Sequence, residues 1–93
     1  MKISQLFKDQ AKFNDLFYEK GMTEKEKEEI TKGLALALHS EVSSLVSGLN
    51  FKDHKTNRKP VDLNNVLYES VDVLRYLISI LNLWEIPSES LVS

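Results

Sequence analysis

Residues 67–81 form the most apolar segment of this 93-residue chain, and two carboxylates interrupt it one helical turn apart. At about 100° per residue, Glu69 and Asp72 project roughly 60° apart on a helix, so both can reach one point beside it. Burying an unpaired carboxylate costs several kcal/mol, and a second carboxylate nearby adds repulsion. The segment therefore predicts a buried helix whose two acids hold a cationic group.

Length and composition restrict the class of protein. A chain of 93 residues makes one domain, which buries only about 60–65% of its unfolded surface and therefore gains much from oligomerising. Because the chain has no cysteine, disulfides and thiolate metal sites are excluded, and a reducing cytoplasm is the natural compartment. No segment has about 18 consecutive apolar residues, so we expect no membrane span.

Residues 52–59 form a basic stretch, with four cations and one acid, although the net charge of the chain is −2. A nucleic-acid-binding protein is more often basic over a whole face, which argues against DNA or RNA as the partner. A short basic loop that contains Lys52 and Lys55 suits a few phosphates better. A loop that is merely well solvated is the alternative.

Apolar periodicity and capping signals predict helices and no strands, hence an all-α fold in a single domain, 1–93. Ser4 can cap a first helix, about 4–18, and Asp62 a third, about 62–84. Thr23 and Glu26 form a capping box that opens a second helix, about 23–49. Residues 88–93 begin a fourth helix that stops after barely one turn, as in a truncated domain.

The second predicted helix carries an acid within its core stripe, since Glu41 takes a position at the spacing of the flanking leucines. Beside Glu41 runs an arc of small residues, among them Gly33 and Ser44. This arc can admit a neighbouring helix closely or leave room for a ligand. Close helix packing accounts for the glycines but not for the carboxylate.

An antiparallel hairpin of the second and third helices would bring Glu41 to Glu69 and Asp72. Three carboxylates suit Mg²⁺ or Mn²⁺, which substrate phosphates typically complete, and predict metal-assisted phosphoester hydrolysis by water. On the first helix, Gln10 and Asn14 lie four residues apart and can read a nucleobase edge, although exposed helical amides usually do nothing specific.

The third predicted helix is apolar nearly all round, and one neighbouring helix cannot cover all of it. We therefore expect a homodimer or homotetramer in which two hairpins build a four-helix-bundle core. A charge placed at Leu74 or Ile78 should dissociate or unfold this assembly.

Three segments resemble the all-α nucleoside triphosphate pyrophosphohydrolases, the MazG-like and dimeric dUTPase group: LHSEVSSL at 38–45, FKDHK at 51–55 and ESVD at 69–72. The resemblance covers about residues 30–86. It implies that Glu41, Glu69 and Asp72 bind Mg²⁺ and that Lys52 and Lys55 approach the phosphates. The implied reaction is attack of water on a nucleoside triphosphate, canonical or non-canonical, between its α- and β-phosphates.

The chain departs from the family pattern where the first motif would have acids and this sequence has Ser40 and Ser44. Ser44 supplies no charge, so a site built for four carboxylates keeps three and should bind Mg²⁺ more weakly. Two classes of function stay open: an active hydrolase, and a nucleotide-binding or oligomerisation module without chemistry. The phosphoribosyl-ATP pyrophosphohydrolases are a related alternative, but residues 51–55 look more like the dUTPase and MazG group.

Overall fold

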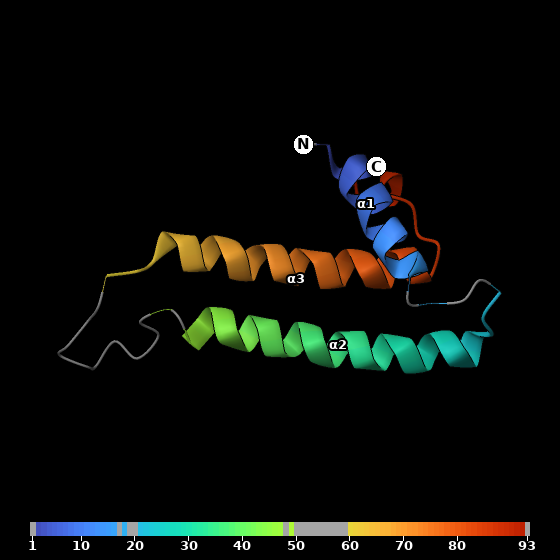
Figure 1. Cartoon of the computed structure of the whole chain (residues 1–93), viewed down its shortest axis with the longest axis horizontal. Coiled ribbons are helices and arrows are strands. Elements are labelled where there is room, and N and C mark those ends of the chain that lie inside the picture. Colours follow the sequence, from blue (N-terminus) through green and yellow to red (C-terminus); the bar gives the residue numbers. More distant parts are fainter. Residues whose placement is uncertain (1, 17, 19–20, 48, 50–59, 93) are drawn as a thin grey trace.

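The computed structural model describes residues 2–16, 18, 21–47, 49 and 60–92, and the regular elements in these ranges are all α-helices (Figure 1). They are α1 (Ile3–Asp15), α2 (Glu24–Ser47), α3 (Leu63–Leu83) and α4 (Glu89–Val92). Helices α2 and α3 pack side by side and antiparallel, while α1 packs at an angle against the C-terminal half of α3. The predicted all-α fold is confirmed.

The starts of α2 and α3 have the caps that the sequence predicted. The backbone N–H of Thr23 donates to the carboxylate of Glu26 at 3.1 Å, and the backbone N–H of Glu26 donates to the Thr23 hydroxyl at 3.2 Å. The carboxylate of Asp62 accepts from the backbone N–H groups of Asn64 and Asn65 at 3.0 and 3.3 Å. These bonds satisfy donors that a helix start otherwise leaves free.

The predicted cap of the first helix is wrong. Helix α1 begins at Ile3 with Lys2 in the cap position, and no side chain caps it, so Ser4 lies inside the first turn. The helix also ends earlier than predicted, at Asp15. None of the described helices is both long and apolar enough to cross a bilayer.

Contacts at the C-terminal end of α3 set the register of the hairpin. The indole N–H of Trp84 donates to the hydroxyl of Thr31 on α2 at 2.8 Å. The ammonium of Lys27, one turn earlier on α2, lies 5.9 Å from the centre of the Trp84 ring, within cation–π range. Counted back from these contacts, the C-terminal third of α2, which carries Glu41, lies opposite the middle of α3.

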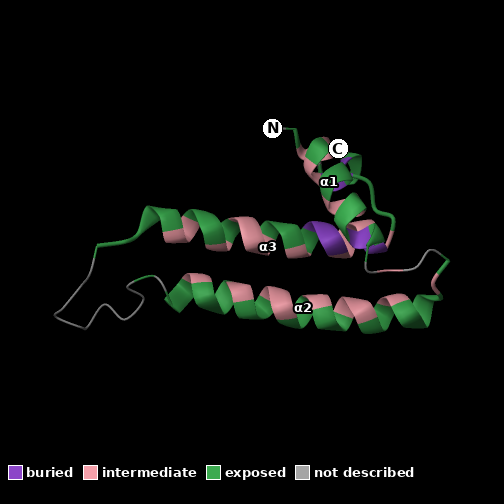
Figure 2. Ribbon diagram, viewed as in Figure 1, coloured by how far each residue is buried: buried purple, intermediate pink, exposed green. Residues whose placement is uncertain are grey.

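Burial is concentrated where α1 crosses α3 (Figure 2). Among the described residues the buried apolar side chains are Phe7, Ile78 and Leu83, and α2 has no buried residue along its length. The radius of gyration is 16.3 Å, whereas a compact domain of this length has about 12 Å. A single chain is therefore elongated and has a small core.

A polar network joins α1 to α3. Gln10 Nε2 donates to Ser79 Oγ at 2.8 Å, Ser79 Oγ donates to Asn14 Oδ1 at 3.2 Å, and Asn14 Nδ2 donates to the Ser79 carbonyl at 3.2 Å. Asn14 and Ser79 are buried, with 8 and 4% of their surfaces exposed. Buried polar groups need such partners, so the network allows few docking positions for α1.

We expect Ser79→Ala to lower the free energy of unfolding by about 1–3 kcal/mol, because it removes the hydroxyl that accepts from Gln10 Nε2 and donates to the buried Asn14 Oδ1. The matched control is Ser70→Ala, which makes the same change at an exposed position of the same helix and should stay within about 0.5 kcal/mol. Urea unfolding followed by circular dichroism measures both. Equal effects of the two variants would mean that the network does not stabilise the docking of α1.

Candidate metal centre

The hairpin brings together three carboxylates from two helices: Glu41 of α2, and Glu69 and Asp72 of α3. One carboxylate oxygen from each lies within 4.8 Å of the other two. Glu69 and Asp72 are neighbours because they lie one turn apart on α3, whereas Glu41 reaches them only through the packing of α2 against α3. Glu41 and Glu69 are half-buried. The role of the three acids as metal ligands stays a prediction.

The electrostatics of this acidic cluster favour added positive charge. A hydrogen bond shared with the Glu69 side chain is the main cause that raises the pKa of Glu41, followed by desolvation and by the negative charges of Asp72 and Glu69. Within the described residues Lys32 pairs with Glu29 at the surface, and none of the three clustered acids has an ion pair. A divalent cation would relieve this repulsion, and oxygen donors are the ligands that Mg²⁺ and Mn²⁺ prefer.

The raised pKa of Glu41 predicts that the contribution of this group to the stability of the metal-free protein falls as the pH rises. Since this carboxyl has a higher pKa in the folded chain than its ordinary value of 4.5, folding binds a proton. Its stabilising contribution is therefore complete below the unfolded pKa and is lost as the pH rises through the folded pKa.

We expect the melting temperature in EDTA to fall less steeply with rising pH, from about 4.5 upward, in Glu41→Gln than in the unmodified protein. The pKa of Glu26 is lowered by hydrogen bonds from Thr23, and Glu26 is present in both proteins. Its effect therefore cancels, and the difference between the two melting curves reports the effect of Glu41. Parallel curves would contradict the prediction.

The hairpin has one polar side, which borders the acidic cluster. On an α-helix, the residue before an interface residue projects about 100° to one side of it. In an antiparallel pair, the residues that precede interface residues on both helices project to the same side of the pair. The residues that directly precede half-buried residues of the α2–α3 interface therefore share one side. We call the part of this side next to the acidic cluster the polar face; it comprises Ser40, Ser44, Tyr68, Asp72 and Arg75.

Arg75 is a cation on this polar face that sequence reasoning missed. It is exposed and lies one turn beyond Asp72 on α3. The signal in the sequence was its spacing of three from Asp72, which places both residues on one side of a helix. Lys52 and Lys55, the cations that the sequence predicted near the phosphates, lie outside the described residues.

Gln10 and Asn14, the predicted base-reading amides, lie where α1 meets α3 and bond to Ser79. Ser79 is seven residues, hence two turns or about 10 Å, from Asp72 on the same side of α3. A carboxamide has two N–H donors and two acceptor lone pairs, so each amide keeps capacity for a ligand beyond the network. Whether they contact a nucleobase stays a prediction.

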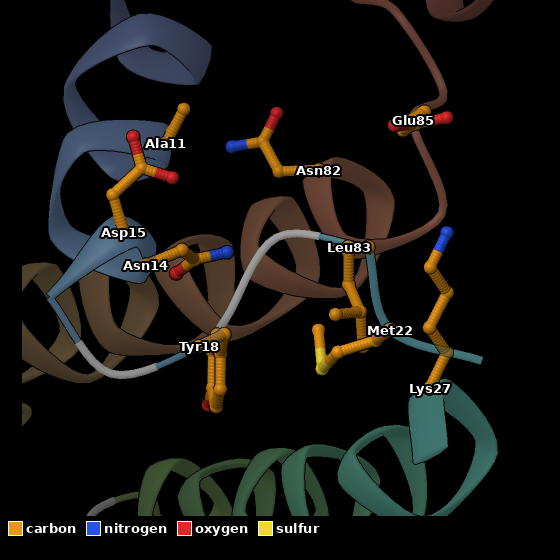
Figure 3. Close-up of a pocket in the computed structure, with 10 residues that line it drawn as sticks. Ala11, Asn14, Asp15, Tyr18, Met22, Lys27, Asn82, Leu83 and Glu85 are labelled. Atoms are coloured by element: carbon orange, nitrogen blue, oxygen red, sulfur yellow. The ribbon is translucent and has the colours of Figure 1, made fainter. Parts of the chain in front are cut away.

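A cavity of about 340 Å³ opens between the ends of α1 and α3 and the start of α2 (Figure 3). Apolar side chains such as Tyr18, Met22 and Leu83 line it together with the polar groups of Asn14 and Lys27. Lys27 is fourteen residues from Glu41, or about 21 Å along α2, so the cavity lies apart from the acidic cluster. It adjoins the α1–α3 network instead.

Two of the small residues beside Glu41, Gly33 and Ser44, do not receive a close helix within the described chain. A Cβ atom added to Gly33 would meet nothing within 4 Å, and Ser44 is exposed. Of the two alternatives for this arc, close contact with a neighbouring helix is therefore not found at Gly33 within the single chain. Ser44 instead lies open on the polar face, one turn beyond Glu41.

Comparison with known proteins identifies the family of the chain. A family model described as dUTPase matches residues 2–91, a range that includes the acidic cluster and the α1–α3 network. No curated protein and no solved structure gave a match. A match over nearly the whole chain, together with the all-α fold, indicates an activity of the nucleotide pyrophosphohydrolase type in general. The chain therefore belongs to the dUTPase family.

Proposed function

We propose that this protein is a Mg²⁺-dependent pyrophosphohydrolase that cleaves a nucleoside triphosphate between its α- and β-phosphates, giving the monophosphate and pyrophosphate. The observation that carries the proposal is the cluster of Glu41, Glu69 and Asp72, whose oxygens lie within 4.8 Å of one another. The dUTPase family match supports the choice of a nucleotide as substrate.

The donor set fits Mg²⁺, with Mn²⁺ as a substitute, because it consists of carboxylate oxygens from Glu41, Glu69 and Asp72. Such a cation neutralises phosphate charge and lowers the pKa of a water molecule that can act as nucleophile. The three acids hold and orient the ion. Ser44 adds a hydroxyl on the polar face that can bind a water but brings no charge.

The polar side of α3 offers a path for the nucleotide. Its phosphates would lie at the acidic cluster and its base near Gln10 and Asn14, since the two ends of this path are about 10 Å apart along α3. The neighbouring cavity of about 340 Å³ is within the size range of small-molecule sites. Lys52 and Lys55 would approach the outer phosphates.

Arg75 should also contact the phosphates, because it is exposed beside Asp72 on the same face. We expect Arg75→Ala to raise KM for the nucleotide about tenfold, because it removes one charge-assisted hydrogen bond to the phosphates. The same change should leave Mg²⁺ binding without nucleotide unchanged or slightly tighter, since it removes a like charge. Isothermal titration with Mg²⁺ alone and steady-state kinetics measure the two effects. Weaker binding of both ligands would mean that Arg75 supports the fold instead.

The decisive experiment is a screen of canonical and modified nucleoside triphosphates with Mg²⁺ and with Mn²⁺, in which the products are identified. Release of pyrophosphate together with a monophosphate is the expected result. Release of orthophosphate would overturn the proposed bond specificity.

A second candidate function, a nucleotide-binding or oligomerisation module without chemistry, is favoured by Ser44, which stands where the family pattern has an acid. In the same screen this function would give nucleotide binding, or no interaction, with no turnover for any substrate. Calorimetry with a non-hydrolysable triphosphate analogue separates binding without turnover from no binding at all.

A further inference from the structure

The cavity between α1, α3 and the start of α2 continues the line of the nucleotide path beyond the base (Figure 3). Along α3, Asp72, Ser79 and Leu83 project within an arc of about 40°, so they lie on one side of the helix. Asp72 belongs to the acidic cluster, Ser79 to the α1–α3 network and Leu83 to the lining of the cavity. Leu83 lies about 6 Å further from the metal site than Ser79 does, measured along the helix axis.

Asn14 connects the network to the cavity. It bonds to Ser79 in the network and also lines the cavity. A base that contacts Asn14 would therefore lie at the entrance of the cavity, with its sugar and phosphates directed toward the acidic cluster. The edge of the base remote from the sugar would face a space of about 340 Å³. Because cavities of about 300 Å³ or more hold drug-sized ligands, this space can take a substituent on the base.

The lining of the cavity is rich in groups that accept hydrogen bonds. The carboxylates of Asp15 and Glu85 belong to it, and neither has an ion pair within the described part of the chain. Asn82 also lines the cavity; its Nδ2 donates to the Phe7 carbonyl at 3.0 Å, so its Oδ1 remains an acceptor. These three groups suit a ligand that carries several N–H donors.

The charge of the lining favours a cation. Lys27 is the one basic side chain among the described residues that line the cavity, against the two acids Asp15 and Glu85. The ammonium of Lys27 lies 5.9 Å from the centre of the Trp84 ring, whose negative π face offsets part of its charge. The cavity is therefore negative in sum, and a cationic group is attracted into it.

Glu85 adopts a backbone conformation that usually belongs to glycine, since its φ is 56°. It follows the C-cap residue of α3, and its N–H donates to the Asn82 carbonyl at 3.0 Å. The N–H of Ile86 donates to the Leu81 carbonyl at 2.9 Å, which completes a Schellman motif. A side chain in this left-handed conformation costs free energy that glycine avoids. Residues held in such conformations cluster at ligand sites, and the Glu85 side chain lines the cavity.

We propose that the preferred substrate is a nucleoside triphosphate whose base carries an amine-bearing, cationic substituent, and that the carboxylates of Asp15 and Glu85 bind this amine in the cavity. The inference rests on the proposed function, which places the phosphates at the acidic cluster and the base at Asn14. Met22 and Leu83 would contact the carbon chain that links the amine to the base. An unmodified base would leave both carboxylates in water and gain nothing from them.

The test compares matched nucleotides in the presence of Mg²⁺. They are dUTP and dCTP that carry at C5 either an aminoallyl group, which ends in an ammonium, or a propynyl group, which has no charge. Steady-state kinetics give kcat/KM for each. We expect the unmodified protein to hydrolyse the aminoallyl nucleotides about tenfold more efficiently than the propynyl nucleotides, the effect of one charge-assisted hydrogen bond.

Variants then locate the group that binds the amine. Glu85→Gln and Asp15→Asn should each reduce this preference at least about threefold, because each removes one charge. Glu85→Gly removes the same carboxylate and relieves the left-handed strain, so it should lower the preference and raise the melting temperature. A damaged fold cannot produce that combination. Glu28→Gln is the matched control and should keep the preference, because Glu28 is an exposed acid on α2 outside the lining of the cavity.

The outcomes separate this inference from the proposed function. Equal efficiency with both kinds of nucleotide would overturn the inference and leave the proposed function standing. A preference for the amine that persists in both Glu85→Gln and Asp15→Asn would also overturn it, because the ammonium would then bind elsewhere. If calorimetry and kinetics detect neither binding nor hydrolysis of any nucleotide, the proposed function fails and the inference fails with it.

Discussion

Glu69→Gln should lower kcat/KM for hydrolysis by on the order of a thousandfold, because it removes one of the three charges that hold the cation. This decrease corresponds to several kcal/mol of lost transition-state stabilisation. Glutamine has nearly the same shape as glutamate, so the α2–α3 packing should persist. In EDTA the variant should be at least as stable as the unmodified protein, since the carboxylate that raises the pKa of Glu41 is gone.

The same variant should lose stabilisation by metal. A cation that binds only the folded state, at a hundredfold excess over Kd, stabilises the unmodified protein by about 2.7 kcal/mol. Melting curves with and without Mg²⁺, run beside the kinetic assay, check both effects. The matched control is Glu29→Gln. It makes the same Glu→Gln change on α2, at an exposed position where the glutamate pairs with Lys32. It should keep full activity, because surface ion pairs contribute about 0–1 kcal/mol.

Retained activity in Glu69→Gln would place the chemistry elsewhere in the molecule. A loss of activity together with a large fall in stability in EDTA would mean that Glu69 supports the fold. Only the combination of lost turnover, lost Mg²⁺ response and unchanged or higher metal-free stability identifies Glu69 as a ligand.

Ser44→Glu should tighten Mg²⁺ binding about tenfold or more and raise the rate of hydrolysis. Ser44 is exposed on the polar face one turn beyond Glu41, so a glutamate there can reach the cluster. A negative charge about 4 Å from a divalent cation gains about 2 kcal/mol even at the dielectric constant of water, which exceeds one factor of ten.

Without metal the same substitution should be destabilising, because it adds a fourth like charge to a cluster that already raises the pKa of Glu41. The control is Ser43→Glu, the same change one residue earlier, at an exposed position that points away from α3. Titration calorimetry and melting curves at several Mg²⁺ concentrations separate the two variants. Equal destabilisation of Ser44→Glu with and without Mg²⁺ would show that no cation binds there.

Much of the local structure could be predicted because its causes lie within a few residues along the chain. The capping box of Thr23 and Glu26 and the cap at Asp62 use side chains and backbone groups two or three residues apart, so their spacing in the sequence is sufficient. The hairpin followed from the apolar periodicity of two long segments joined by one loop. The cluster of Glu41, Glu69 and Asp72 could then be expected from three acids in the stripes that face each other.

The cap at Ser4 shows where local signals fail. A serine at that position can cap a helix, but the cap position is Lys2, two residues earlier, and the helix packs Phe7 into the core. Docking of α1 on α3 contributes more than a single cap, which is worth about 1 kcal/mol.

By itself, the sequence determined the all-α class, the caps of α2 and α3, and the acids that the hairpin brings together, because each depends on spacing along one helix or between two neighbours. Only the tertiary structure decided which sides of α3 are covered. Gln10 and Asn14 bond to Ser79, and Ile78 is buried while Leu74 is exposed. The physical reason is that α3 is apolar on several sides, so periodicity cannot choose among them. The angle at which α1 crosses the helix, set by contacts between residues more than sixty positions apart, makes that choice.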